Sequence, residues 1–316
     1  MSVIAIDIGG TKVLGAVFST DGKILAKKTL LLNGAGGEDA CAIVLDIIRD
    51  LVKLCPEGAV DAIGACVPGI VYHEDGSVWA PNIPGWERFP LLSVIKKEVG
   101  EGIHVDIESD RSCYILGEAW MGAAKGSSDA VYMAVGTGIG LGILLGGHLV
   151  RGHDDIAGAI GWTALQSPFM EEYSQCGCFE TFASGSGIGK QLQKAVKEAP
   201  EYAGALKSKA PEDLSSYDAF ANYDSDPVAR KVLDKAIEMW GMASANIVSL
   251  LNPEIVVFGG GVFGPAGRFI EDIRKEALKW GQPIAMQRVR FAVSTLPGEA
   301  ALYGAARLVI NENTKQ

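Results

Sequence analysis

A strand, a turn rich in glycine and threonine, and a second strand follow one another at the start of this chain. The apolar residues 3–8 and 13–18 predict the two strands, and the letters DIGGTK at 7–12 predict the turn. Glycine permits positive φ and lacks the Cβ that would keep an anion away from backbone N–H groups. A plain hairpin with solvated polar residues explains these letters equally well. The residues expected to meet a phosphate are Gly9, Gly10, Thr11 and Lys12.

The same pattern returns in the second half of the chain, and this repetition favours the phosphate interpretation. Apolar strands are predicted over 131–135 and 139–145, with the turn Gly136-Thr137-Gly138 between them. Two such units predict two similar lobes, and we expect an extended phosphate chain to lie between their turns. The dinucleotide fingerprint and the Walker A loop are both absent from the sequence, so those two nucleotide-binding modes lose support.

Composition limits the class of protein. The 316 residues fit one large or two medium domains, and an apolar fraction of 48% with 40 glycines suits an α/β protein. No apolar stretch is long enough to span a bilayer, and residues 1–2 lead directly into a strand, so we expect neither a membrane anchor nor a signal peptide. The net charge of −10 argues against a nucleic-acid partner. Six dispersed cysteines do not form a disulfide framework, and a cytoplasmic protein is expected.

Apolar periodicity predicts alternating helices and strands along the rest of the chain. Residues 202–227 are polar and broken by prolines, which predicts a surface excursion with short helices, and 311–316 are expected to be disordered. Further strands are expected over 59–67, 104–107, 255–258 and 288–293, and helices over 38–54, 91–98, 112–121, 184–198, 228–247, 268–280 and 299–310.

The segment Glu108-Ser109-Asp110 ends the strand predicted over 104–107. From the residues alone, Asp110 is best interpreted as the N-cap of the helix that begins near Ser112, because Asp is common at such turns. A carboxylate at this place could also accept a proton from a substrate hydroxyl.

The order and spacing of six segments resemble the ROK family of sugar kinases and sugar-responsive repressors. The resemblance implies the actin/hexokinase-like ATPase fold, an α/β fold with two lobes around a nucleotide and substrate cleft. The lobes would be 1–112 plus 300–316, and 113–299, and members form homodimers or homotetramers. The segments are 7–12, Val67-Pro68-Gly69, 81–86, 136–140, 177–180 and Gly259-Gly260-Gly261.

This resemblance implies an ATP-dependent kinase that phosphorylates a hydroxyl of a small sugar or sugar-like polyol, with Asp110 as general base. Asp7 would hold Mg²⁺ through water. The first phosphate turn begins too early to leave room for a DNA-binding domain, which favours the kinase branch. The expected ATP and phosphate contacts are Asp7, Gly9, Gly10, Thr11, Lys12, Thr137, Gly138, Gly260 and Gly261. The expected substrate contacts are Gly69, Asn82, Ser109, Asp110, Arg111 and Glu180.

The sequence departs from the family at the substrate contacts. Ser109 replaces the usual Asn, and Arg111 replaces a small residue. Ala159 and Trp162 replace a Glu and a His that normally bind the sugar. A site that loses two polar anchors should lose its usual selectivity. A cyclitol, a keto-sugar or a modified sugar is therefore expected in preference to glucose. Arg111 either lowers the pKa of Asp110, contacts a carbonyl or carboxylate of the substrate, or points away.

The family's structural zinc site is also altered. Its four ligand positions correspond to Trp162, Glu171, Tyr173 and Cys178. Cys176 adds one thiol, but two thiols do not make the four ligands of structural zinc. We expect no zinc, with Trp162 and Tyr173 packed into the space.

Three alternatives remain open at this stage. A ligand-binding pseudokinase or sensor would explain the lost sugar contacts, although retention of Asp7, Lys12 and Asp110 opposes it. An ordinary glucokinase is the second alternative. A different enzyme of the same ATPase fold, such as an acetate-type kinase or a hydrolase, is the third.

Overall fold

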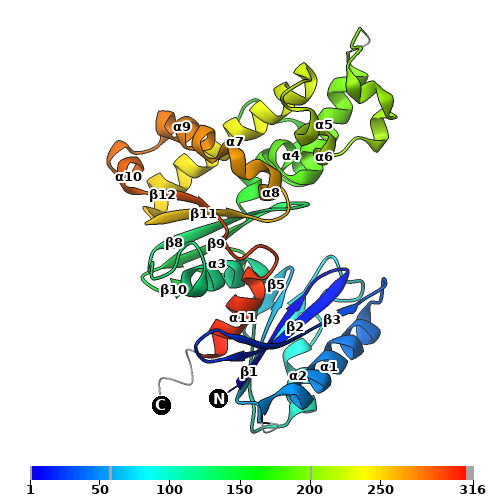
Figure 1. Ribbon diagram of the computed structural model, residues 1–316, viewed down its shortest axis with the longest axis vertical. Coiled ribbons are helices and arrows are strands. Elements are labelled where there is room, and N and C mark those ends of the chain that lie inside the picture. Colours follow the sequence, from blue (N-terminus) through cyan, green and yellow to red (C-terminus); the bar gives the residue numbers. More distant parts are fainter. Residues whose placement is uncertain (1, 57–58, 200, 311–316) are drawn as a thin grey trace. The chain divides into compact units, whose positions relative to one another are not determined.

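The computed structural model describes residues 2–56, 59–199 and 201–310, so the tail 311–316 that was expected to be disordered lies outside the described residues. The chain divides into two compact units (Figure 1). The first comprises Met1–Ser128, Gly142–Ala157 and Thr295–Gln316, and the second comprises Asp129–Leu141 and Gly158–Ser294.

A mixed sheet forms the centre of the first unit. Its order is β3-β2-β1-β4-β7, where β1–β2 and β2–β3 are antiparallel and β1–β4 and β4–β7 are parallel. A small antiparallel hairpin, β5 and β6, follows β4. The strands are β1 (Ser2–Ile8), β2 (Lys12–Ser19), β3 (Ile24–Leu31), β4 (Ala62–Val67), β5 (Ile70–Tyr72), β6 (Ser77–Trp79) and β7 (His104–Ser109).

Helices cover both faces of this sheet, which explains why residues 3–6 of β1 are all apolar. Side chains alternate between the two faces of a strand. Ile4 and Ile6 therefore join the core formed with α1 (Gly37–Leu54) and α2 (Leu91–Val99), whereas Val3 and Ala5 join the core formed with α11 (Ala300–Ile310). A sheet buried on both faces needs continuous apolar runs, as this sequence shows.

Two glycines allow α3 (Asp110–Met121) to pack closely on α11. A Cβ on Gly117 would lie 2.1 Å from the carbonyl oxygen of Ala300, and one on Gly304 would lie 1.8 Å from that of Cys113. Both distances are shorter than any real contact, so the two helix backbones touch. This contact places α3 in the first unit, whereas the sequence placed the lobe boundary at residue 113.

The second unit is built around the sheet β10-β9-β8-β11-β12, and the division between the units passes through β9. Each sheet begins with three consecutive strands joined by short turns, and the first of these strands pairs in parallel with a later one: β1 with β4, and β8 with β11. The two sheets therefore have the same topology, as the repeated pattern predicted. The strands are β8 (Ala130–Val135), β9 (Ile139–Leu145), β10 (His148–Leu149), β11 (Ile255–Gly259) and β12 (Arg290–Val293).

The long helix of the second unit, α7 (Pro227–Leu251), has clear end signals. Asp226 accepts hydrogen bonds from the amides of Val228 and Ala229 at 2.9 and 3.1 Å, and Pro227 occupies the first turn. Asn252 closes the other end in the left-handed conformation. The other helices are α4 (Cys178–Ala183), α5 (Gly185–Lys197), α6 (Ser216–Asn222), α8 (Phe263–Ala266), α9 (Ile270–Trp280) and α10 (Pro283–Arg288).

The predicted surface excursion contains two short 3₁₀ segments, η4 (Ala205–Ser208) and η5 (Pro211–Asp213), followed by α6. Two further 3₁₀ segments, η2 (Ile160–Trp162) and η3 (Glu171–Ser174), precede α4, and η6 (Gly267–Phe269) follows α8. The helix α10 was not expected, since the sequence predicted a strand from residue 288 onward.

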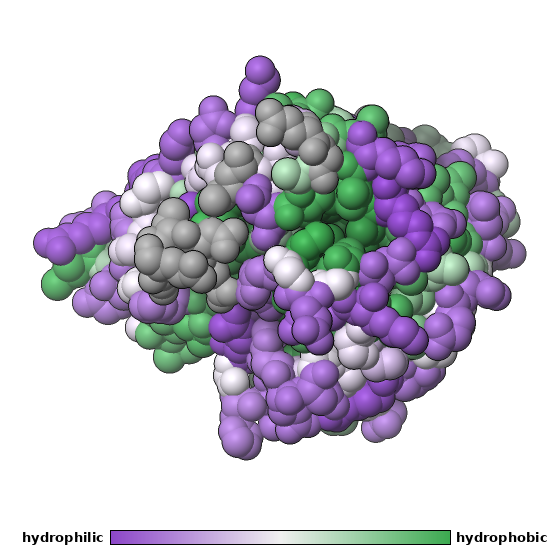
Figure 2. All heavy atoms as spheres, turned by 90° about the horizontal axis from the view of Figure 1, so that it is seen from below, coloured by the Kyte–Doolittle hydropathy of each residue, from purple (hydrophilic) through white to green (hydrophobic). Residues whose placement is uncertain are grey.

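The surface seen in Figure 2 is largely hydrophilic, with an area of apolar residues between the polar ones. None of the described helices is long and apolar enough to cross a bilayer.

Candidate functional site

The first glycine turn is closed and lies against the loop that carries Asn82. The amide of Gly9 donates to the carbonyl of Lys12 at 2.9 Å. A Cβ on Gly10 would lie 2.8 Å from the Cβ of Asn82, so glycine is required for this approach. The structure thus brings a predicted phosphate contact and a predicted substrate contact together, while Thr11 and Lys12 are exposed to solvent.

Asp7 ends β1 next to this turn. Burial raises the pKa of its carboxyl group, whereas the Cys66 thiol, which donates to Oδ1 at 3.3 Å, and the charge of Lys12 both lower it. A hard carboxylate oxygen is a suitable partner for a hydrated Mg²⁺. Among the described residues, no group of three or more His, Cys, Asp or Glu could bind a metal directly. The donor set therefore fits a contact through water.

The N-cap of α3 is Ser109. Its side-chain oxygen accepts from the amide of Ser112 at 3.3 Å and donates to the hydroxyl of Ser112 at 3.0 Å. Asp110 is the first residue of the helix, so the structure does not support its interpretation as the cap. Ser109 itself is buried and committed to this cap. Its expected contact with a substrate hydroxyl stays a prediction.

Asp110 keeps partial contact with solvent, yet its carboxyl group lies among protein atoms. Burial raises its pKa to about 6, and the negative charge of Asp7 adds to this, while the charge of Arg111 acts in the opposite direction. The amide of Arg111 donates to Oδ1 at 2.7 Å, and the hydroxyl of Tyr114 lies 3.5 Å from Oδ2. A carboxyl group with this pKa is ionised at neutral pH and remains basic enough to accept a proton.

Arg111 points toward the predicted substrate residues of the first unit. Its Nη2 donates to the carbonyl oxygen of Gly69 at 3.3 Å, and within the described residues its side chain makes no other hydrogen bond. A Cβ on Gly69 would lie 1.9 Å from the carbonyl oxygen of Trp79, so glycine is needed where the two loops meet. The guanidinium therefore keeps donors for a ligand.

In the second unit, Glu180 supports the second glycine turn. Its Oε2 accepts from the amide of Ile139 at 2.6 Å, and a Cβ on Gly138 would lie 2.8 Å from that oxygen. Burial raises the pKa of Glu180 and the hydrogen bond from Ile139 lowers it, with burial dominant. The structure thus joins Glu180 to the Gly138 turn.

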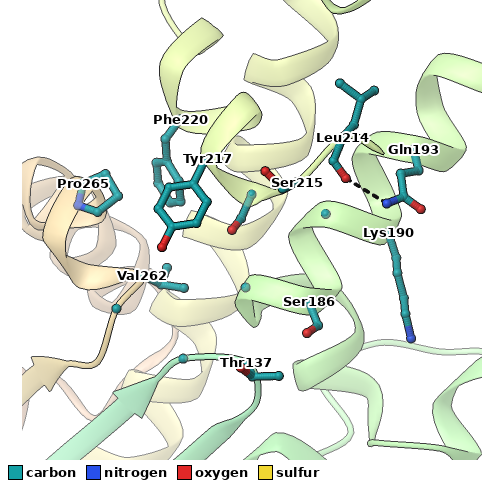
Figure 3. A pocket seen from close by; sticks show the side chains of 15 residues that line it. Thr137, Ser186, Lys190, Gln193, Leu214, Ser215, Tyr217, Phe220, Val262 and Pro265 are labelled. Atoms are coloured by element: carbon teal, nitrogen blue, oxygen red, sulfur yellow. Dashed lines mark hydrogen bonds between the residues drawn. The ribbon is translucent and has the colours of Figure 1, made fainter. Parts of the chain in front are cut away.

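A cavity of about 620 Å³ opens beside this turn, within the second unit. Thr137 lies at one end with Ser186 and Lys190 of α5, and Tyr217 and Phe220 of α6 reach toward the other end (Figure 3). Gln193 donates to the carbonyl oxygen of Leu214 at 2.8 Å and fixes the wall between these helices.

The cavity contains part of the predicted nucleotide set and several residues that the sequence did not indicate. Thr137 and Gly261 line it. Gly260 does not, and its role is backbone geometry, because φ is +86° and a Cβ would lie 2.4 Å from the carbonyl oxygen of Val135. The helix α5 was expected over 184–198, and its glycine- and serine-rich start, SGSGIGK at 184–190, is the signal that could have indicated a binding role. The residues missed are Ser186, Lys190, Gln193, Ser215, Tyr217 and Phe220.

The segment that corresponds to the family's zinc site has one expected and one unexpected feature. Tyr173 is buried, lies edge-on to Phe182 and accepts a hydrogen bond from Gln166. Trp162, in contrast, is 58% exposed, so the expectation that it fills this space is wrong. The backbone explains the difference, because η2 turns Trp162 outward while η3 turns Tyr173 inward.

The model of the ROK family matches residues 3–312 of the chain. A glucokinase from Thermotoga maritima is 29% identical, over 98% of this chain and 97% of the relative. A xylose repressor from Caldicellulosiruptor bescii is 28% identical, over 98% of this chain and 78% of the relative.

Solved structures agree with this match. A ROK family glucokinase from Streptomyces griseus, in complex with glucose and AMPPNP, superimposes with a TM-score of 0.75 at 28% identity, covering 98% of this chain and 99% of that one. The fold is therefore the actin/hexokinase-like ATPase fold that the family resemblance implied.

Proposed function

This chain belongs to the ROK family, and we propose that it is an ATP-dependent kinase that phosphorylates a hydroxyl of a small polyhydroxylated substrate, with Asp110 as general base. The observation that carries the proposal is the state of Asp110. It is a partly exposed carboxyl group at the start of α3, with a pKa raised to about 6, and it is not needed as a helix cap.

The residues of the second unit suit ATP. Thr137, Ser186 and Lys190 gather hydroxyls and a cation at one end of the cavity, which matches phosphate groups. The aromatic rings of Tyr217 and Phe220 suit a purine base. The volume of about 620 Å³ is in the ordinary range for small-molecule sites.

The residues of the first unit suit the acceptor and the metal. The side chains of Asn82 and Arg111 would hold acceptor oxygens. Asp110 would take the hydroxyl proton as the acceptor oxygen bonds to the γ-phosphorus of ATP, the bond from that phosphorus to the β,γ-bridging oxygen breaks, and ADP leaves. Asp7 would bind Mg²⁺ through water, and Mg²⁺ neutralises the charge that develops on the transferred phosphoryl group. Positioning by these residues, more than covalent chemistry, would supply the rate enhancement.

The acceptor is proposed to be a cyclitol, a keto-sugar or a modified sugar, in preference to glucose. Ala159 offers no side-chain hydrogen bond, and Trp162 offers one N–H on a ring that is largely exposed. Relatives named glucokinase make glucose the necessary comparison. By analogy with those relatives, we further propose a cytoplasmic protein that assembles as a homodimer or homotetramer.

Coupled ADP release with MgATP tests the proposal against hexoses, amino sugars, keto-sugars and inositols, with glucose in the same panel. We expect the wild type to turn over one acceptor strongly, and we expect that turnover to be abolished in Asp110→Asn. Equal turnover of glucose would refute the altered selectivity. If no compound in the panel is turned over but some of them still raise the melting temperature, the result would favour the sensor that the repressor relatives suggest.

A further inference from the structure

Three charged or titratable residues of the first unit, His73, Arg151 and Asp155, gather around the buried carboxylate of Glu108, and we call these four residues the Glu108 cluster. The Nε of Arg151 lies 2.6 Å from Oε2 of Glu108. The Nε2 of His73 lies 3.6 Å from the same oxygen and 3.7 Å from Oδ1 of Asp155. His73 is therefore placed between two carboxylates.

Glu108 is the fixed charge of this cluster. Its side chain is 3% exposed. Burial alone would raise its pKa, but the ion pair with His73 at 3.6 Å and the charge of Arg151 outweigh burial and hold the pKa below its usual value. A buried carboxylate is tolerated when it is paired in this way. Removing a partner would leave an uncompensated charge.

The cluster joins three segments that are distant in sequence. His73 lies in the turn between β5 and β6, Glu108 lies near the end of β7, and Arg151 and Asp155 lie in the loop that follows β10. That loop is closed on itself, since the amide of Ala157 donates to the carbonyl oxygen of Arg151 at 2.9 Å. Arg151 and Asp155 are therefore carried by one compact turn.

The cluster also lies next to the proposed base. Oε1 of Glu108 accepts from the amide of Ser109 at 2.8 Å. Ser109 caps α3, and Asp110 follows it. The orientation of Glu108 thus bears directly on the backbone turn that presents Asp110.

We propose that protonated His73 is a positioning residue, which bridges Glu108 and Asp155 and thereby holds the loop 151–157 and the β5–β6 turn against the strand end that presents Asp110. Loss of its proton as pH rises removes the bridge and lowers turnover. This inference rests on the proposed kinase function.

The charges that face His73 favour its proton in the folded protein. The contact with Glu108 at 3.6 Å raises the pKa of His73 most strongly, burial opposes this, and Asp155 raises it while Arg151 lowers it. Glu74 and Asp75 on its own turn are paired with Arg88 at 2.6 and 3.1 Å. Because the folded pKa is raised, the stabilisation is complete below the ordinary value of about 6.5 and is lost as pH rises through the folded value.

The pH dependence of kcat for the best acceptor tests this role. The wild type should show two limbs: an acid limb from Asp110 and an alkaline limb from His73. In His73→Gln the alkaline limb should disappear, and kcat at pH 6.5 should fall about threefold to tenfold while KM for MgATP stays unchanged. The control is His153→Gln in the same loop, whose side chain is 98% exposed and which should keep the wild-type profile.

Two measurements on the free protein separate failure of this inference from failure of the proposed function. The imidazole resonances of His73 should titrate above the ordinary histidine value in an NMR experiment. The melting temperature of the wild type should exceed that of His73→Gln at pH 6, with a smaller difference at pH 9. Titration of His73 at or below its ordinary value, or identical alkaline limbs in the wild type and His73→Gln, would overturn the inference. If the protein has no kinase activity, the positioning role is refuted together with the proposed function. The NMR titration and the melting temperatures then still test whether His73 bridges Glu108 and Asp155.

Discussion

Ser109 and Ser112 are joined by a reciprocal pair of contacts at the start of α3: the amide of Ser112 donates to Oγ of Ser109 at 3.3 Å, and the two hydroxyls lie 3.0 Å apart. The capping role and the proposed catalytic role therefore lie on two neighbouring residues, Ser109 and Asp110. Ser109 caps the helix, and the carboxyl group of Asp110 is left for a reaction.

Replacement of Ser109 should therefore affect stability. Ser109→Ala removes the acceptor for the Ser112 amide and should lower the free energy of unfolding by about 1 kcal/mol. Ser109→Asn, which keeps a capping oxygen, is the matched control and should lose little. Urea denaturation measures both variants. Equal stability of the alanine variant and the wild type would contradict the assignment of the cap.

Asp110 should set the acid limb of activity. Its pKa of about 6 means that kcat/KM should fall roughly tenfold per pH unit below that value, because the protonated group cannot accept a proton. The folded pKa lies above the ordinary value of about 4, so ionisation costs stability as pH rises through this interval. Asp110→Asn should therefore lose turnover about 10²-fold or more yet melt at a higher temperature than the wild type at pH 8. A lower melting temperature would indicate a structural role.

Arg111 should act on both the acceptor and the base. Arg111→Met removes the charge that lowers the pKa of Asp110, so the acid limb should move to higher pH. If the guanidinium also binds a carbonyl or carboxylate of the acceptor, KM for the acceptor should rise about tenfold to a hundredfold. Arg111→Lys should keep the position of the acid limb and lose part of the acceptor affinity. An unchanged pH profile in the methionine variant would show that Arg111 points away from Asp110 in solution.

Metal dependence should follow magnesium alone. Only Cys178 of the four corresponding residues is a usual zinc ligand, and Tyr173 is packed against Phe182. Elemental analysis of the purified protein should therefore find far less than one zinc per chain. A zinc-selective chelator should leave the melting temperature unchanged, whereas EDTA without added Mg²⁺ should abolish turnover. Stoichiometric zinc whose removal lowers the melting temperature would contradict the prediction.

The sequence was a good guide to the central strands of both units. Strands β1, β2, β4, β8 and β11 are largely apolar runs of five to eight residues, and such short runs next to turn residues are typical of buried strands. Residues 13–18 and 131–135 fall within β2 and β8 as expected. The boundary of α3 was placed two residues late, because Ser109 and Asp110 are both good capping residues and the sequence favoured Asp110 as the cap.

The contacts that define the site were much harder to predict. Arg151 and Glu108 are 43 residues apart, and nothing local to either indicates the pair. Tyr217 of the cavity wall lies in a polar, proline-rich excursion whose letters suggest loop structure. Trp162 could be recognised as a departure from the family, but its exposure depends on the direction in which η2 turns. Such features arise from tertiary structure.

The close approach of α3 and α11 has a consequence for how a cell makes this protein. During synthesis Asp110 leaves the ribosome long before residues 300–310 exist, yet Gly117 of its helix packs against the backbone of Ala300, and Cys113 against Gly304. Until residues 300–310 have been synthesised, this face of α3 is uncovered and accessible to chaperones and proteases. The helix pair is thus completed only after residues 300–310 have been synthesised, and a chain truncated near residue 300 should be insoluble because α3 lacks this packing partner.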